Sequence, residues 1–94
     1  MSYRLRFKTV AKKEWDKLDP SVRSILKKHL VERLKKPRNE PNRLSGMKDC
    51  YKIKLRQMGY RLVYQVRDKE LVVVVVAVGK REKNFVYKRA IKRI

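Results

Sequence analysis

The sequence of 94 residues contains one cysteine and one histidine, and each scarcity excludes a class of chemistry. The single Cys50 cannot form an internal disulfide or build a cysteine metal cluster, so a reducing compartment, the cytoplasm, is expected. With His29 alone, a ribonuclease mechanism based on a histidine pair is impossible. A cysteine nucleophile is also disfavoured, because no histidine accompanies Cys50 in the sequence. We therefore predict structural roles for Cys50 and His29.

Acidic residues are too few and wrongly placed for a two-metal nuclease. Such a site needs several carboxylates that converge from neighbouring strands and loops. The carboxylates of the N-terminal part instead belong to predicted helices and their ends: Glu14, Asp16, Asp19 and Glu32. We expect no metal and no other cofactor.

Positive charge dominates the composition, with 28 Lys and Arg against 9 Asp and Glu and a formal net charge of +19. A polyanion would relieve the resulting self-repulsion, and nucleic acid is the leading candidate. A membrane surface is the weaker alternative, because the most apolar run, LVVVVVAV at 71–78, is far shorter than the roughly 20 residues that span a bilayer. The N-terminal MSYRLRFK also lacks the apolar core of a signal peptide. We expect no membrane partner.

The N-terminal part of the chain predicts a strand followed by a helical hairpin. Residues 3–8 alternate in polarity, as a half-buried strand does. A first helix is expected with Thr9 as its N-cap, and Asp19 and Pro20 cap and open a second helix that Pro37 stops. Helical spacing predicts the packed faces: Ala11, Trp15 and Leu18 in the first helix, and Val22, Ile25, Leu26, His29, Leu30 and Leu34 in the second.

The C-terminal part predicts three strands and a short basic helix. After an irregular loop at 37–49, two alternating runs joined at 57–59 are typical of a hairpin, and the β-branched run that Gly79 ends is typical of a central strand covered on both faces. We predict one α+β domain, residues 1–94: an antiparallel-rich sheet of about four strands with the N-terminal helical hairpin on one face. Tyr51, Ile53 and Leu55 are expected on the core face of the hairpin. In the last helix, expected over residues 80–94, apolar residues recur at helical intervals: Val86, Tyr87, Ala90, Ile91 and Ile94.

Basic residues and tyrosines are the remaining candidates for a catalytic role. RNA can be cleaved by its own 2′-hydroxyl attacking the adjacent phosphate, and cations can stabilise the charge of the transition state without a metal. A tyrosine among cations should have a lowered pKa and could act as a general base. In so basic a chain, however, the same row also fits the solvated face of a hairpin, so the residue pattern leaves both interpretations open. The candidates are Lys52, Lys54, Arg61, Arg81 and Tyr87.

Longer stretches of the sequence resemble a known family. DCYKIKLRQMGYRLVYQV at 49–66, VVVVVAVGKRE and the following VY, together with KEWDKL, RLSGM and AIKRI, are similar to the RelE toxins of bacterial toxin–antitoxin pairs. The resemblance extends over almost the whole chain. It implies a compact fold like that of the microbial ribonucleases and a ribosome-dependent endonuclease activity. Such toxins cut mRNA in the ribosomal A site, leave a 2′,3′-cyclic phosphate and a 5′-hydroxyl, and inhibit translation.

The resemblance assigns roles to the candidate residues. Tyr87 would be the general base on the 2′-hydroxyl, and Arg81 would assist the leaving 5′-oxygen. Because an arginine rarely gives up its proton, we favour charge stabilisation for Arg81 over acid catalysis. Lys52, Lys54 and Arg61 would hold the scissile phosphate and stabilise the transition state, with Lys54 also a participant in activating the nucleophile.

The chain departs from the family pattern in one loop. The position before the glycine of RLSGM is often basic in the family, whereas here it is Ser45. One RNA contact is therefore in doubt, and Arg43, two residues earlier, could substitute for it. Arg43 and Ser45 complete the predicted RNA-binding set.

The resemblance also implies the partners. These are a 70S ribosome with mRNA in its A site, and a cognate RelB-like antitoxin whose extended segment displaces the C-terminal helix. DNA would be contacted only indirectly, through the antitoxin complex. Two alternatives are a basic RNA- or ribosome-binding module without catalysis and a ribonuclease that cuts naked RNA. Lysines of the first two helices fit a ribosomal-RNA docking surface or an ordinary solvated face equally well: Lys12, Lys13, Lys17, Lys27 and Lys28.

Overall fold

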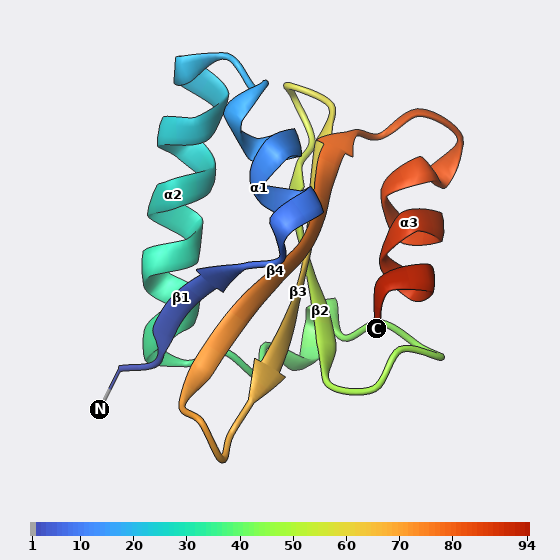
Figure 1. The fold of residues 1–94 in the computed structure, drawn as a ribbon. Coiled ribbons are helices and arrows are strands. Elements are labelled where there is room, and N and C mark those ends of the chain that lie inside the picture. The colour runs from blue at the N-terminus through green and yellow to red at the C-terminus, as the bar shows by residue number, and fades with distance from the viewer. Residues whose placement is uncertain (1) are drawn as a thin grey trace.

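The computed structural model describes residues 2–94, and they form four strands, three α-helices and two short 3₁₀ helices (Figure 1). The predicted α+β class is confirmed. In chain order the elements are β1 (Arg4–Phe7), α1 (Thr9–Asp16), α2 (Pro20–Lys35), η1 (Glu40–Asn42), β2 (Cys50–Leu55), β3 (Tyr60–Arg67), β4 (Val72–Lys80), η2 (Glu82–Asn84) and α3 (Phe85–Arg93).

The strands form one sheet in the order β1-β4-β3-β2. β1 runs parallel to β4, whereas β2 with β3 and β3 with β4 are antiparallel. The β-branched strand β4 therefore lies inside the sheet, and its residues 72–78 are buried. The predicted central strand is confirmed, although it continues past Gly79 to Lys80.

A β-bulge interrupts the pairing of β3 with β4. Val63 is opposite Ala77, but its neighbour Tyr64 is opposite Val75, so Val76 has no partner on β3. Val76 and Ala77 consequently both contribute to the same apolar cluster instead of alternating between faces. A continuous run of β-branched residues carries no sign of such an insertion, because every residue of it is apolar.

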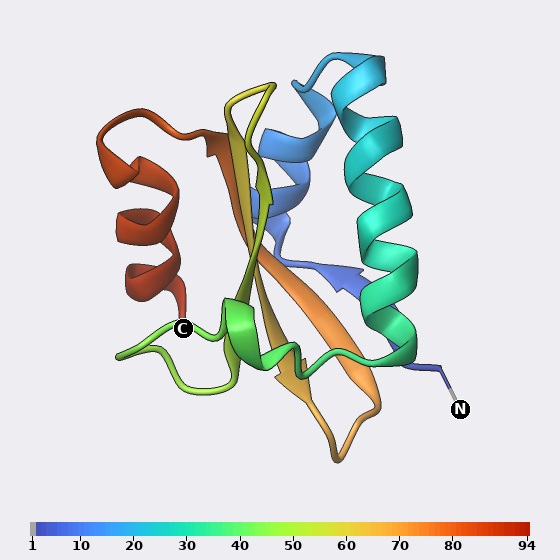
Figure 2. The same cartoon turned by 180° about the vertical axis from the view of Figure 1, so that it is seen from behind.

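Apolar side chains fill both faces of the sheet. α1 and α2 cover one face, where Leu26 and Leu30 of α2 pack in the same core as Tyr51, Ile53 and Leu55 of β2. α3 covers the opposite face, as Figures 1 and 2 show. We call its contacts the α3 cluster, formed by Met47, Cys50, Val63, Val76, Ala77, Val86 and Ala90, with Leu44 and Tyr87 packed against it. The predicted core side of β2 is confirmed.

The helical hairpin differs from the prediction in detail. Lys8 is the N-cap of α1, so the assignment of Thr9 is wrong by one residue, whereas Asp19 as N-cap and Pro20 as first residue of α2 are confirmed. Ile25 is 37% exposed and His29 is also exposed, so their assignment to the packed face is wrong. The buried residues of α2 recur every four positions in a single row, narrower than the apolar pattern suggests.

The C-terminal helix begins later than its sequence suggests. Lys83 and Asn84 have φ angles of 49° and 59°, a left-handed conformation that breaks the helix and delays its start to Phe85. Of the apolar residues at helical spacing, Val86 and Ala90 are buried, whereas Ile91 and Ile94 are 52% and 43% exposed. None of the helices in residues 2–94 is both long and apolar enough to cross a bilayer.

Candidate functional site

Three predicted cations share the α3 side of the sheet. Lys52 and Lys54 alternate with the core residues of β2, and Arg61 is directly opposite Lys54 on β3. Because a strand residue two positions from Cys50 faces the same way, both lysines lie on the side that α3 covers. We call Lys52, Lys54 and Arg61 the basic face. The predicted arrangement of these three residues is confirmed.

Crowding of like charges alters Lys54. The positive charge of Lys52 lowers the pKa of Lys54 below its ordinary value, and burial, Arg56 and Arg61 act in the same direction. Each neighbouring cation makes it easier for the Lys54 ammonium group to lose its proton. The lowered pKa moves Lys54 toward general-base behaviour.

Arg81 lies at the end of the sheet where Lys54 and Arg61 are paired. Its backbone N–H donates a hydrogen bond to the carbonyl oxygen of Gly59 over 2.9 Å. Gly59 has a φ of 72°, and a Cβ placed there would meet the Arg81 Nε at 3.6 Å, so the arginine side chain runs across this glycine. The β2–β3 turn thus positions Arg81, and the side chain remains exposed.

Tyr87 enters the site from α3. Its ring is half-buried against the α3 cluster, and its hydroxyl oxygen is buried without a hydrogen-bond partner among the described residues. Burial raises the pKa of Tyr87, and Arg61, which lies near the phenol without forming a hydrogen bond of good geometry, only partly offsets this effect. The expectation of a lowered pKa is therefore wrong, because burial outweighs the positive charge of Arg61.

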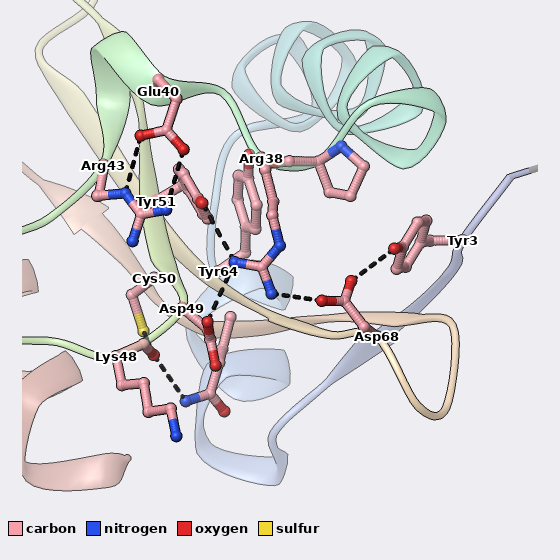
Figure 3. A network of polar contacts seen from close by, with 12 residues as sticks. Tyr3, Arg38, Glu40, Arg43, Lys48, Asp49, Cys50, Tyr51, Tyr64 and Asp68 are labelled. Atoms are coloured by element: carbon pink, nitrogen blue, oxygen red, sulfur yellow. Dashed lines mark hydrogen bonds and ion pairs between the residues drawn. The ribbon is translucent and has the colours of Figure 1, made fainter.

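The loop residues Arg43 and Ser45 have different environments. Arg43 donates from Nε and one terminal nitrogen to the two carboxylate oxygens of Glu40, each over 2.9 Å, and its guanidinium lies 5.3 Å from the centre of the Tyr51 ring (Figure 3). Ser45 is exposed in the turn that follows Leu44, a neighbour of the α3 cluster. Because Arg43 is paired with Glu40, Ser45 is more available than Arg43 for a contact with RNA.

Sequence reasoning missed an arginine that fixes the start of β2. Arg38 donates to the carboxylates of Asp49 over 3.1 Å and Asp68 over 2.6 Å, and to the Tyr51 hydroxyl over 3.3 Å (Figure 3). Tyr3 donates to the other oxygen of Asp68 over 2.6 Å. Asp49 has a φ of 61°, so this network holds a residue in a strained conformation directly before the strand of the basic face. The sequence signal for this network is limited to Asp49 and Asp68, the two aspartates at turn positions.

A second missed arginine anchors the backbone of Lys52. Arg33 of α2 donates to the Lys52 carbonyl oxygen over 3.1 Å and to the buried Tyr64 hydroxyl over 2.9 Å. Tyr64 in turn donates to the carbonyl oxygen of Pro37 over 2.7 Å. These bonds hold the end of α2 on the face of the sheet opposite the basic face. They thereby fix the backbone of β2 at Lys52.

Cys50 is fully buried in the α3 cluster, and burial raises the pKa of its thiol to about 11. Since only the thiolate reacts with alkylating agents, we expect iodoacetamide at pH 8 to modify native Cys50 at least ~100-fold more slowly than a free thiol. Mass spectrometry of timed samples would measure the rate, with the guanidinium-unfolded protein as the control. Equal rates in the folded and unfolded protein would contradict the buried environment.

The lysines of the first two helices are exposed. Lys12 pairs with Asp16 over 2.6 Å, whereas Lys13, Lys17, Lys27 and Lys28 have no ion pair within residues 2–94. Both interpretations of these lysines, a docking surface or a solvated face, are compatible with this exposure.

Residues 5–85 match the family model described as the ParE toxin of the type II toxin–antitoxin system parDE. The matched segment ends two residues before Tyr87. A relative that covers this position is the mRNA interferase toxin RelE of Escherichia coli strain K12, 61% identical over 94 residues, which are 100% of this chain and 99% of the relative.

Two solved structures are similar to the structure of this chain. A mutant of the E. coli toxin RelE in the free state matches with a TM-score of 0.92 and 60% identity over 100% of this chain and 99% of the other. The toxin in the intact E. coli RelBE toxin–antitoxin complex matches with a TM-score of 0.84 and 60% identity over 87% of this chain and 100% of the other. The chain therefore belongs to the ParE toxin family of type II toxin–antitoxin systems and, within that family, to the RelE toxins.

Proposed function

We propose that this protein is an mRNA interferase, the toxin of a toxin–antitoxin pair, and that it cuts mRNA in the ribosomal A site and so inhibits translation. The full-length identity to a relative named mRNA interferase toxin RelE supports the enzyme class. The observation that carries the proposal is geometric: three cations share the side of the sheet that α3 covers, and Tyr87 approaches Arg61 from that helix.

The proposed reaction uses the 2′-hydroxyl of the RNA as nucleophile. The 2′-oxygen attacks the adjacent phosphorus, the bond to the 5′-oxygen breaks, and the products carry a 2′,3′-cyclic phosphate and a 5′-hydroxyl. Lys52 and Arg61 hold the phosphate and stabilise the negative charge that builds up in the transition state. Arg81 stabilises the charge on the leaving 5′-oxygen, which takes its proton from water.

The pKa directions divide the roles of Lys54 and Tyr87. Lys54, whose pKa is lowered, becomes neutral more readily than an ordinary lysine and accepts the proton of the 2′-hydroxyl. Tyr87, whose pKa is raised, remains neutral near pH 7 and offers its hydroxyl as a hydrogen-bond donor to the reacting group. This assignment shifts the general base from Tyr87, the expectation from family resemblance, to Lys54.

Partners follow from the charge and from the relatives. The E. coli relative is bound to its antitoxin RelB in the intact complex, and we propose a RelB-like antitoxin for this chain. The exposed lysines of α1 and α2, together with Ser45, are proposed to contact ribosomal RNA. DNA would be reached only through the antitoxin complex.

Programmed ribosomes with an empty A site test the proposed activity. Purified protein is expected to cut the A-site codon, as mapped by primer extension, and the upstream fragment should end in a 2′,3′-cyclic phosphate. An active RelE toxin serves as the positive control. Absence of a cut by folded protein would contradict the proposal.

The same assay separates the alternatives. A non-catalytic ribosome-binding module would cosediment with ribosomes and leave the mRNA intact. A free-standing ribonuclease would cut the same mRNA without ribosomes. Only the proposed function requires cleavage that depends on the ribosome and on the A-site codon.

A further inference from the structure

Apolar packing holds α3 to the sheet only weakly. The helix has nine residues, and among them only Val86 and Ala90 are buried. Helices of this length are marginal on their own, so tertiary contacts must hold α3. Its apolar residues Phe85 and Ile91 are 43% and 52% exposed and contribute little, as does Ile94 directly after the helix, which is 43% exposed.

The helix has a second attachment at an open edge of the sheet. β1 is short and pairs with residues 72–75 of β4, so within residues 2–94 the rest of that β4 edge has no neighbouring strand. Two side chains take the place of the missing strand. Glu14 Oε1 accepts the Val78 N–H over 3.3 Å, and Arg93 of α3 donates to the Val76 carbonyl oxygen over 2.9 Å.

At this edge the two side chains also bind each other. Arg93 donates to Glu14 Oε1 over 2.8 Å and to Oε2 over 3.0 Å, and Arg89 donates to Oε2 over 3.0 Å. The side chains of Glu14 and Arg93 are each only 20% exposed, so the pair is partly desolvated. Such charge-assisted, bidentate hydrogen bonds are stronger than surface ion pairs. One carboxylate of α1 therefore joins two turns of α3 to β4.

We propose that Glu14 is a positioning residue of this toxin, which fixes α3, and with it the Tyr87 hydroxyl, beside the basic face through Arg93 and Arg89. The catalytic consequence rests on the proposed function, whereas the fixing of α3 does not. Glu14 contacts α3 at Arg89 and Arg93, whereas Tyr87 packs against the α3 cluster. Glu14 therefore acts on the reaction through the position of the helix and touches no reacting atom.

Lowering the pH should weaken the attachment of α3, because it protonates the Glu14 carboxylate. Burial by itself raises the pKa of Glu14, but the Arg93 and Val78 hydrogen bonds and the charges of Arg93 and Arg89 together lower it. A carboxylate with a lowered folded-state pKa stabilises the fold above its unfolded pKa, and this contribution is lost as pH falls through the folded value. The titratable side chains around Glu14 are those of Lys17, Tyr60, Lys80, Arg89 and Arg93, and none of these five is a carboxylate.

Hydrogen exchange of the α3 amides, compared with those of α2, tests the proposal directly. Glu14→Gln keeps the size and the acceptor for Val78 but removes the charge. We expect the α3 amides to exchange at least about tenfold faster and those of α2 to be unchanged. Glu32→Gln, which removes an exposed charge paired with Lys35 over 3.7 Å, is the matched control and should change neither helix. Unchanged α3 exchange in Glu14→Gln would overturn the proposal.

Two further measurements keep the test decisive. In the wild-type protein the protection of α3 relative to α2 should fall as the pH drops below 4.5, the ordinary glutamate value, and Glu14→Gln should lack this dependence; a fall of equal size in both proteins would overturn the proposal. The Glu14→Gln, Arg93→Gln and double variants should show non-additive effects on α3 exchange, and additivity would also overturn it.

The ribosome assay adds the catalytic readout. Glu14→Gln should lower kcat about tenfold with little change in KM for ribosomes, because the docking surface is intact while the tyrosine is less well placed. Unchanged kcat would overturn the catalytic part of the proposal. If the wild-type protein itself does not cut, the proposed function fails, and the exchange measurements still decide whether Glu14 fixes α3.

Discussion

Lys54→Met is expected to lower the single-turnover rate of A-site cleavage by about 10²- to 10⁴-fold, the range for loss of a general base. The lysine lies opposite Arg61 on the basic face, and the neighbouring Lys52 lowers its pKa. Because neutral Lys54 accepts the proton in the proposed reaction, the wild-type rate should rise with pH and level off below pH 10.5, the ordinary lysine value. The variant should lose this dependence.

A lysine outside the site provides the control for Lys54→Met. Lys69 is exposed in the β3–β4 turn, at the end of the hairpin remote from Arg61, so Lys69→Met removes the same charge without touching the basic face. Cleavage by this variant should stay within about twofold of wild type, and ribosome binding by both variants should fall only a few-fold, as expected for one exposed phosphate contact. A Lys54→Met variant that cleaves as fast as Lys69→Met would rule out Lys54 as the base.

Tyr87→Phe is expected to change activity and stability in opposite directions. The variant loses one hydrogen-bond donor in the transition state, so cleavage should fall about 10²- to 10³-fold. The hydroxyl oxygen is buried and makes no hydrogen bond within residues 2–94, although Arg61 lies near it, so removing it should raise the free energy of unfolding by about 1 kcal/mol, the low end of the cost of an unsatisfied buried polar group. Primer extension on programmed ribosomes measures the first quantity and urea unfolding the second.

The two measurements on Tyr87→Phe discriminate between roles for this hydroxyl. A group kept only for packing would lower stability when removed, and activity would follow stability. A group kept for function costs stability and is retained for catalysis, so its removal gives a more stable and less active protein. Tyr64→Phe is the contrasting variant, because the Tyr64 hydroxyl bonds to Pro37 and Arg33 and its loss should lower stability.

Local patterns predicted the parts of the site that lie on β2 and β3. The face on which a strand side chain lies depends on its own backbone, so alternation was enough to place Lys52 and Lys54 together, and pairing in a hairpin brought Arg61 opposite them. The start of α2 was predicted for the same reason, since Pro20 at the first helical position acts within one turn.

Local patterns failed where packing partners decide the outcome. Ile25 and Ile91 have the spacing of core residues, yet both are exposed because no element of residues 2–94 covers that side of α2 or α3. The bulge at Val76 left no trace in an unbroken apolar run. Charge alone predicted a lowered pKa for Tyr87, whereas burial in the α3 cluster, which depends on the position of a whole helix, raises it.

By itself, the amino-acid sequence determined the α+β class, the basic face of the hairpin and the resemblance to the RelE toxins, because these depend on residue types and on spacings of a few positions. Only the tertiary structure decided that α3 covers the basic side, that burial raises the pKa of Tyr87, and that Glu14 reaches Arg93, 79 positions along the chain. The physical reason is that burial and long-range ion pairs arise when distant segments meet, and no local spacing encodes that meeting.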